Sequence, residues 1–226
     1  MNEPLLRAED LTYAVDGRTI IDGVSLRIEA SERVAVMGPS GSGKSTLFTL
    51  LAGLATPAAG RVLLRGEPVG ESGRQEISYV FQGYGLVSLL TAAENIEVAL
   101  RAAGRAPEHA RRLAADALDM VGLTPFADHL IEELSGGQQQ RTAVALALAR
   151  RPGLLLADEP TAEQDSGNRD LVLKGLLAET ERGAALVIAT HDPDVAARCD
   201  RTLTLRAGRL APPETLPETR TEAPAD

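Results

Sequence analysis

A glycine-rich segment between a predicted strand and a predicted helix constrains this chain more than any other feature. Residues 38–46 read Gly-Pro-Ser-Gly-Ser-Gly-Lys-Ser-Thr, residues 33–37 before them read as a buried strand, and residues 45–52 after them read as a helix. A strand, a glycine-rich turn ending in Lys-Ser and a helix N-terminus together indicate a phosphate-binding loop. The predicted phosphate-binding residues are Gly38, Ser40, Gly41, Gly43, Lys44, Ser45 and Thr46.

The chemistry of this loop follows from three kinds of residue. Its glycines let the backbone turn tightly, so that main-chain N–H groups converge on phosphate oxygens. Lys44 adds a positive charge for the β- and γ-phosphates, and the Ser45 hydroxyl is a ligand for Mg²⁺. A merely flexible glycine–serine turn is the alternative, and the complete strand–loop–helix pattern disfavours it.

Two carboxylates follow a second predicted buried strand. Residues 154–157 are Leu-Leu-Leu-Ala, and Asp158 and Glu159 come directly after them. Carboxylates at such a strand end hold Mg²⁺ and orient water in nucleotide hydrolysis, whereas a solvated strand end is the simpler alternative. Together with the loop, the pair predicts that the chain binds a nucleoside triphosphate with Mg²⁺ and hydrolyses it.

A second anion-binding element lies far along the chain from the loop. Residues 134–141 read Leu-Ser-Gly-Gly-Gln-Gln-Gln-Arg, and Ser135 followed by Gln138 is a capping-box pattern that places them at a helix start. Free N–H groups, glycines and a hydroxyl at a helix N-terminus favour an anion site over a simple cap. The chain therefore has two predicted phosphate-binding elements.

Composition narrows the class of protein. The 226 residues carry 23 Lys and Arg against 32 Asp and Glu, a net charge of −9, which argues against nucleic-acid binding through bulk positive charge. Cys199 is the only cysteine, which excludes an intrachain disulfide and a cysteine-based metal site and is consistent with a reducing cytosol. No apolar stretch approaches the ~18–20 residues that span a bilayer, and no signal peptide is visible.

The periodicity of apolar residues predicts strands that alternate with helices. Predicted strands are Leu5–Tyr13, Val24–Ile28, Val34–Met37, Arg61–Leu64, Ile77–Phe81, Leu154–Ala157, Ala185–Ala189 and Arg201–Leu205, with turns at Asp16-Gly17 and Asp22-Gly23. Predicted helices are 45–52, 91–103, 107–121, 136–150, Asn168–Glu181 and a short one from Pro193.

This alternation indicates an α/β fold with a largely parallel sheet and helices on its faces. The stretch from about residue 83 is dominantly helical and interrupts the alternation, so we expect an inserted helical subdomain over about 83–150. We expect one domain over 1–210. The tail 211–226 contains four of the 13 prolines and little apolar surface, which predicts disorder.

The ordered set of motifs resembles the ATP-binding subunit of an ABC transporter. The resemblance covers residues 5 to about 210: the phosphate loop, Gln82 closing Tyr-Val-Phe-Gln, the signature 134–138, the two carboxylates, and His191 after a late strand. It implies a P-loop NTPase fold with an N-terminal antiparallel β subdomain. It also implies a head-to-tail homodimer, in which each ATP lies between the loop of one chain and the signature of the other.

The resemblance also implies roles for individual residues. Tyr13 would stack on adenine, with a core-packing aromatic as the alternative, and His191 would contact the γ-phosphate. Glu159 would polarise the attacking water, Asp158 would hold Mg²⁺ through water, and Gln82 would ligate Mg²⁺ or position water. The implied metal ligands are Ser45, Gln82 and Asp158, and further implied nucleotide-binding residues are Ser135, Gly136, Gly137, Gln138 and Asp165.

Two positions depart from the family pattern. Gln164 replaces the apolar residue that usually precedes Asp165, in a segment that crosses the dimer interface, and Leu146 stands where many relatives have Arg. Neither change touches a predicted catalytic carboxylate, so we still expect turnover. Arg141, which follows the signature, is expected to be structural.

Residues 91–100 resemble the branch of subunits for lipoprotein release, macrolide efflux and antimicrobial-peptide resistance. This implies an exporter or mechanotransmission complex, with the chain on the inner face of the membrane, in the cytoplasm, beside a separate permease. A regulatory ATPase that signals without transport, as in cell-division complexes, is the alternative. An ATPase acting on nucleic acid or ribosomes is disfavoured by the single acidic domain, and a small-molecule kinase by the signature.

Overall fold

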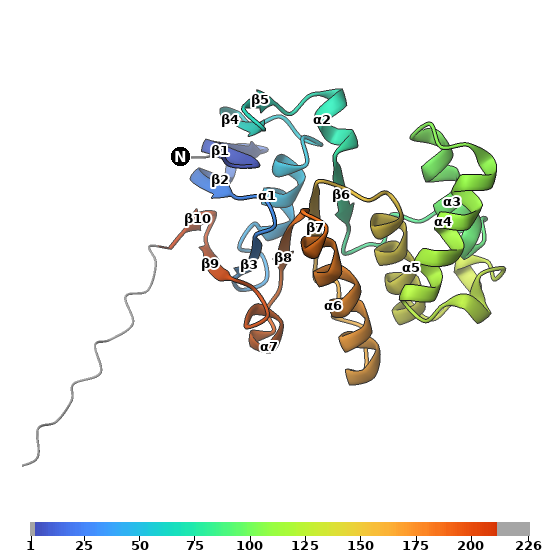
Figure 1. The fold of residues 1–226 in the computed structure, drawn as a ribbon. Coiled ribbons are helices and arrows are strands. Elements are labelled where there is room, and N and C mark those ends of the chain that lie inside the picture. The colour runs from blue at the N-terminus through green and yellow to red at the C-terminus, as the bar shows by residue number, and fades with distance from the viewer. Residues whose placement is uncertain (1–2, 212–226) are drawn as a thin grey trace, which may run out of the picture.

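The computed structural model describes residues 3–211. Figure 1 shows two sheets stacked at one end of the molecule and a group of helices at the other. The predicted disordered tail lies, apart from Ala211, outside the described residues. The α/β fold with a mostly parallel core sheet, an antiparallel N-terminal sheet and a helical subdomain is as predicted.

The core sheet has the strand order β10-β9-β3-β8-β7-β6, and neighbours are parallel except β10 and β9. Its strands are β3 (Arg33–Met37), β6 (Ile77–Val80), β7 (Leu154–Asp158), β8 (Ala185–Ala189), β9 (Arg201–Arg206) and β10 (Arg209–Leu210). Every residue of β7 and β8 is buried, because both faces of a parallel sheet are covered. Leu154 and Leu156 pack into one apolar cluster, and Leu155 and Ala157 into the other.

The N-terminal sheet is antiparallel, in the order β2-β1-β4-β5. It comprises β1 (Leu6–Val15), β2 (Arg18–Ile28), β4 (Ala59–Leu64) and β5 (Glu67–Pro68). The predicted turn at Asp22-Gly23 is wrong, because β2 continues through it. Leu11 pairs with Val24 and Tyr13 with Ile21, so one extra β2 residue is accommodated as a bulge, with Gly23 at a φ of 63°.

The helices are α1 (Lys44–Leu51), α2 (Glu71–Gln75), α3 (Ala92–Ala102), α4 (Pro107–Met120), α5 (Gly136–Ala149), α6 (Ser166–Glu181) and α7 (Pro193–Ala196), with 3₁₀ turns at Thr124–Phe126 and Ile131–Glu133. Helix α1 packs in the cluster between the two sheets, and α5 and α6 cover the other face of the core sheet. The predicted capping box at Thr91 is confirmed by both of its hydrogen bonds with Glu94, of 2.9 and 3.1 Å.

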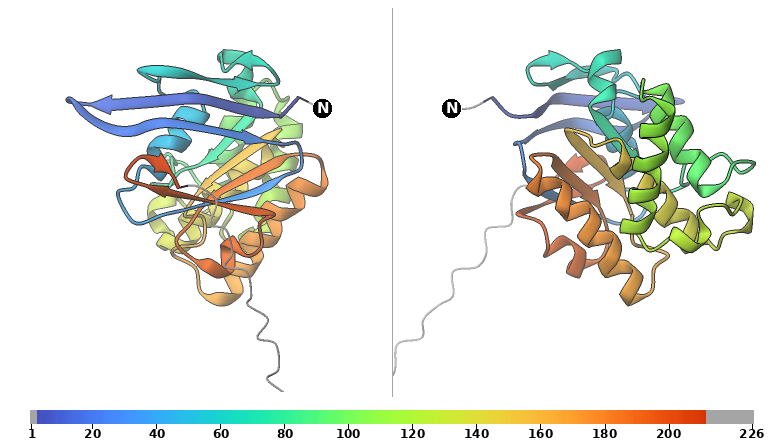
Figure 2. Two further views of the ribbon diagram at one scale, coloured as in Figure 1. Left: turned by 90° about the vertical axis from the view of Figure 1, so that its left-hand side faces the viewer. Right: turned by 45° about the vertical axis from the view of Figure 1, so that its right-hand side comes forward.

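Helix α5 contacts both the helical subdomain and the core sheet. Figures 1 and 2 show α3 and α4 beside α5 at the end of the molecule away from the N-terminal sheet. The buried residues of α3 and α4 form one cluster with α5, β7 and α6. The helix that starts at the predicted signature therefore packs against β6 and shares one apolar cluster with β7, the neighbouring strand that ends at Asp158.

Candidate functional site

The carboxyl ends of four parallel strands bring the predicted residues together. The phosphate loop follows β3, Gln82 follows β6, the carboxylate pair ends β7, and His191 follows β8. Ligands of open α/β sheets bind at this edge. One cavity of about 820 Å³ is lined there by Arg18, Ile20, Ser40, Gly41, Gly43, Lys44, Ser45, Thr46, Gln82, Asp158, Glu159, Ala162 and His191. The structure therefore unites the loop with all three predicted catalytic residues.

The phosphate loop needs glycine where other backbone comes close. A Cβ on Gly38 would collide with the carbonyl oxygen of Leu205 in β9, so the loop can follow β3 only with glycine there. Gly43 precedes α1 with a left-handed φ of 103°. Lys44 Nζ donates to the carbonyl oxygens of Gly38 (2.8 Å) and Pro39 (3.3 Å), which keeps its charge inside the turn.

Asp158 is a buried carboxylate that faces the loop. It is 2% exposed, and its Oδ2 has no hydrogen-bond partner within the described residues. Burial raises the pKa of Asp158, while a hydrogen bond from the Ser45 hydroxyl and the charge of Lys44 act in the opposite direction. A buried carboxylate oxygen with a free acceptor position beside a serine hydroxyl is the kind of oxygen donor set that Mg²⁺ takes. The residues present therefore fit a Mg²⁺ ion.

Glu159 and His191 form a pair at the mouth of the cavity. Glu159 Oε1 lies 3.0 Å from His191 Nδ1, and the two side chains are 12% and 72% exposed. A carboxylate oxygen accepts hydrogen bonds, so the contact is a hydrogen bond in the form of His191 that carries a proton on Nδ1. The carboxylate thus contacts the residue that follows β8, and within residues 3–211 its other oxygen has no side-chain or backbone hydrogen-bond partner.

Seven predicted nucleotide-binding residues do not line this cavity: Gly38, Tyr13, four residues of the signature and Asp165. Ser135 and Gln138 form the predicted capping box of α5, with hydrogen bonds of 2.9 and 3.3 Å, and Gly136 and Gly137 follow Ser135 in its first turn. Asp165 caps α6 by accepting a hydrogen bond from the N–H of Asn168 at 2.9 Å. In one chain, the signature and the phosphate loop therefore do not form one site.

Tyr13 is half-buried, packs against the apolar cluster between the sheets and is not among the residues that line the cavity. Stacking of Tyr13 on adenine stays a prediction. Arg18 and Ile20 of β2 line the cavity instead, and the sequence analysis missed both. One feature could have indicated Arg18 and Ile20. Strand β1 pairs with β2 so that Tyr13 lies opposite Ile21, which brings this part of β2 beside the predicted adenine-binding residue.

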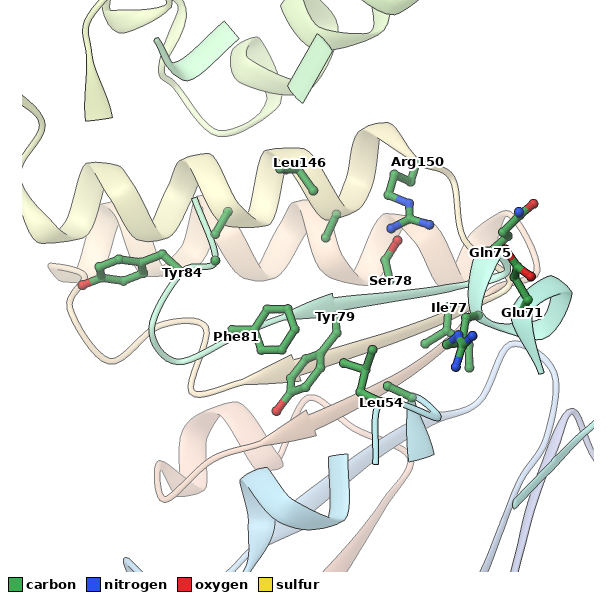
Figure 3. A pocket seen from close by; sticks show the side chains of 15 residues that line it. Leu54, Glu71, Gln75, Ile77, Ser78, Tyr79, Phe81, Tyr84, Leu146 and Arg150 are labelled. Carbon is green, nitrogen blue, oxygen red and sulfur yellow. The ribbon is translucent and has the colours of Figure 1, made fainter. Parts of the chain in front are cut away.

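A second cavity of about 460 Å³ is a groove between the core and α5 (Figure 3). Leu54, Tyr79 and Phe81 lie on one side, and Leu146 and Arg150 of α5 lie on the other. The rings of Tyr79 and Phe81 are in contact, with centroids 4.1 Å apart and planes tilted by 31°. Because Gln82 follows Phe81 directly, the groove and the first cavity share one segment of chain.

Comparison with known proteins agrees with this geometry. The family model described as ABC transporter matches residues 21–162, which include the loop, the signature and the carboxylate pair. This chain belongs to the ABC transporter family. It is an ABC ATPase, whose hydrolysis of ATP is coupled to transport.

Individual relatives place the chain within that family. It is 44% identical to the lipoprotein-releasing system ATP-binding protein LolD of Gluconobacter oxydans, over 85% of this chain and 87% of that protein. It is 41% identical to the macrolide export ATP-binding/permease protein MacB of Hyphomonas neptunium, over 93% of this chain and 34% of that protein. This family member therefore spans most of the first relative and about a third of the second.

A solved structure shows the same fold. The ATP-binding cassette MJ0796, in a dimeric post-hydrolysis state with ADP and Pi, has a TM-score of 0.85 and 34% identity, over 92% of this chain and 97% of that one. No helix among residues 3–211 of this ABC ATPase combines the length and apolarity that crossing a bilayer requires.

Proposed function

We propose that this chain is the ATP-hydrolysing subunit of a bacterial exporter or mechanotransmission complex. It powers a separate membrane permease through ATP-driven dimerisation, from the cytoplasmic face of the membrane. One observation carries the proposal: the phosphate loop, both carboxylates and His191 line one cavity, while the signature of the same chain lies outside it. The similarity to lipoprotein-releasing and macrolide-export proteins supports the exporter branch.

The residues divide the work of hydrolysis among them. Loop N–H groups and Lys44 hold the phosphates, and Ser45, Gln82 and Asp158 hold Mg²⁺, which when bound neutralises phosphate charge. Glu159 polarises the attacking water as a general base. His191, fixed by its contact with Glu159, reaches the γ-phosphate.

The signature acts on the nucleotide of a second copy of this chain. Its glycines Gly136 and Gly137 form the first turn of α5, and the N-terminus of a helix attracts phosphate. A head-to-tail homodimer places these groups opposite the partner's phosphate loop and so completes two sites. The dimeric state of the similar cassette supports this arrangement.

The groove in Figure 3 is proposed as the docking site for a cytoplasmic segment of the permease. Leu54 and Phe81 expose 52% and 38% of their surfaces, and both line this groove. Apolar side chains exposed together in a groove mark interaction sites, whereas single exposed ones do not. The groove continues into Gln82, so a segment bound in it touches the chain that lines the nucleotide cavity. This continuity gives ATP binding a direct mechanical connection to the membrane partner.

Substituting Leu54 tests the docking groove. Leu54→Asp should reduce association with the permease about tenfold or more, because a leucine buried in an interface contributes about 1.5–3 kcal/mol. The measurement is the amount of multi-spanning membrane protein that co-purifies with the tagged chain from solubilised membranes. Val15→Asp is the matched control, since Val15 is similarly exposed at 47% but lies at the end of β1. Equal recovery with both variants would argue against this docking site.

Substituting Lys44 tests the loop. Lys44→Ala should weaken ATP binding by about tenfold to a hundredfold, because hydrogen bonds to charged groups contribute about 1.5–3 kcal/mol. Isothermal titration calorimetry measures the affinity. Lys174 is the only other lysine and is exposed on α6, so Lys174→Ala is the control and should bind ATP normally. Unchanged affinity in Lys44→Ala would contradict the assignment of the loop.

A further inference from the structure

A path of three polar side chains connects α5 with the segment that follows β7. Arg141 and Gln140 of α5 are 8% and 2% exposed, and Gln164 is half-buried. Arg141 Nη1 donates to Gln164 Oε1 (2.7 Å), and Gln164 Nε2 donates to Gln140 Oε1 (3.1 Å). Gln140 Nε2 then donates to the carbonyl oxygen of Glu159 (2.6 Å). A continuous series of hydrogen bonds thus runs from a guanidinium to the backbone of the proposed base.

Arg141 fixes the direction of this series. A guanidinium only donates, so Gln164 must turn its oxygen toward Arg141 and its nitrogen toward Gln140. The nitrogen of Gln164 also donates to the carbonyl of Gly137 (2.9 Å), and the oxygen of Gln140 also accepts from the N–H of Glu163 (3.2 Å). Each amide therefore has one orientation that satisfies its partners, and the nitrogen of Gln140 is directed to the far end of the path.

The backbone of Glu159 needs such support. Its φ of 49° lies in the left-handed region, which a residue with a side chain adopts only where the surroundings hold it. Its N–H donates to the carbonyl of Ala189 in β8 (2.9 Å), and its carbonyl accepts from Gln140 Nε2 (2.6 Å) and from the N–H of Ala162 (3.2 Å). Both peptide groups are thus fixed, and the carboxylate is directed at His191.

We propose that Gln140, Gln164 and Arg141 are positioning residues that hold the Glu159 carboxylate in its orientation for hydrolysis. This inference rests on the catalytic role proposed above for Glu159. Gln164 stands where the family has an apolar residue, and an apolar side chain makes none of these hydrogen bonds. The series also joins Glu159 to the helix that begins with the signature, so it fixes the two elements relative to each other.

Steady-state kinetics of two substitutions test the proposal. Gln140→Leu removes the shorter of the two hydrogen bonds to the Glu159 carbonyl and leaves the one from Ala162, so kcat should fall about tenfold, the scale of one buried hydrogen bond. ATP affinity should not change, because the phosphate loop is intact. Gln164→Leu removes one hydrogen-bond partner of the Gln140 amide but keeps the Gln140 donor itself, so the decrease in kcat should be smaller. The double variant should be no slower than Gln140→Leu alone, because Gln164 acts through Gln140.

Thr142→Val is the matched control. Thr142 lies on the same helix, is fully buried and donates to the carbonyl of Gln138 (2.9 Å), so its loss removes a comparable hydrogen bond outside the series. It should leave kcat unchanged even if the melting temperature shifts. An equal loss of kcat in this control would show that general destabilisation explains the effect, and would overturn the positioning role.

The remaining outcomes separate the positioning role from the proposed function. Wild-type kcat in both Gln140→Leu and Gln164→Leu, or losses that multiply in the double variant, would overturn the proposal. If Gln140→Leu does not fold, Gln164→Leu alone carries the test, because the family accommodates an apolar residue there. Full turnover in Glu159→Gln would remove the proposed function itself. Loss of turnover in Glu159→Gln with normal kcat in both glutamine variants would remove only the positioning role.

Discussion

Glu159→Gln should bind ATP normally and hydrolyse it about 10²–10⁴-fold more slowly, the usual contribution of a general base. The amide keeps the size of the side chain but loses the negative charge that orients water. Glu159 lies 3.0 Å from His191 in the cavity that contains the phosphate loop. Among the described residues, Asp158 is the one other carboxylate that lines this cavity. The measurement is phosphate release under saturating Mg²⁺-ATP.

Glu181→Gln is the control for this substitution. Glu181 is exposed at the end of α6, away from both cavities, and its variant should have wild-type turnover. A near-normal rate in Glu159→Gln would show that another residue is the base. Loss of ATP binding in that variant would show instead that the substitution damages the site as a whole.

The second large effect is expected at the signature. Ser135→Arg places a bulky side chain at the N-terminus of α5, outside the chain's own cavity, while Lys44 and the rest of the loop stay intact. The variant should therefore bind ATP as a monomer but fail to dimerise and fail to turn over. Equilibrium ATP binding and single-turnover hydrolysis measured on the same preparation separate these effects.

Mixing experiments then show whether the signature acts on the partner's nucleotide. A heterodimer of Ser135→Arg with Lys44→Ala has both defects in one site and neither in the other, so hydrolysis should return. If the signature served its own chain's nucleotide, both sites would be defective and mixing would restore nothing. Activity that stays at zero at every ratio, with heterodimers demonstrated by differently tagged chains, would contradict action in trans.

The parts of the site that follow from local patterns could be predicted from the sequence. Apolar runs predicted β3, β7 and β8, and the residues that follow these strands meet at one sheet edge because parallel strands align their carboxyl ends. The capping box at Ser135 placed the start of α5 correctly. Short elements such as α2, β5 and β10 were missed, because so few residues carry no periodicity.

The failures come from contacts between distant segments. Asp22-Gly23 has the local preference of a turn, but pairing along β1 incorporates it into β2 as a bulge. Gln164 appeared only as a departure from a family pattern. Its hydrogen bond to Gln140 joins residues 24 positions apart and depends on how α5 packs on the core sheet, which no local pattern encodes.

The molar mass of Glu159→Gln in solution tests the central claim most directly. In the proposed dimer two ATP molecules lie between two chains, each held by one loop and the other chain's signature, and slow hydrolysis should preserve that state. Size-exclusion chromatography with light scattering should give the mass of two chains with Mg²⁺-ATP and of one chain with ADP. A single-chain mass at saturating Mg²⁺-ATP, with ATP shown to be bound, would contradict the nucleotide-sandwich dimer.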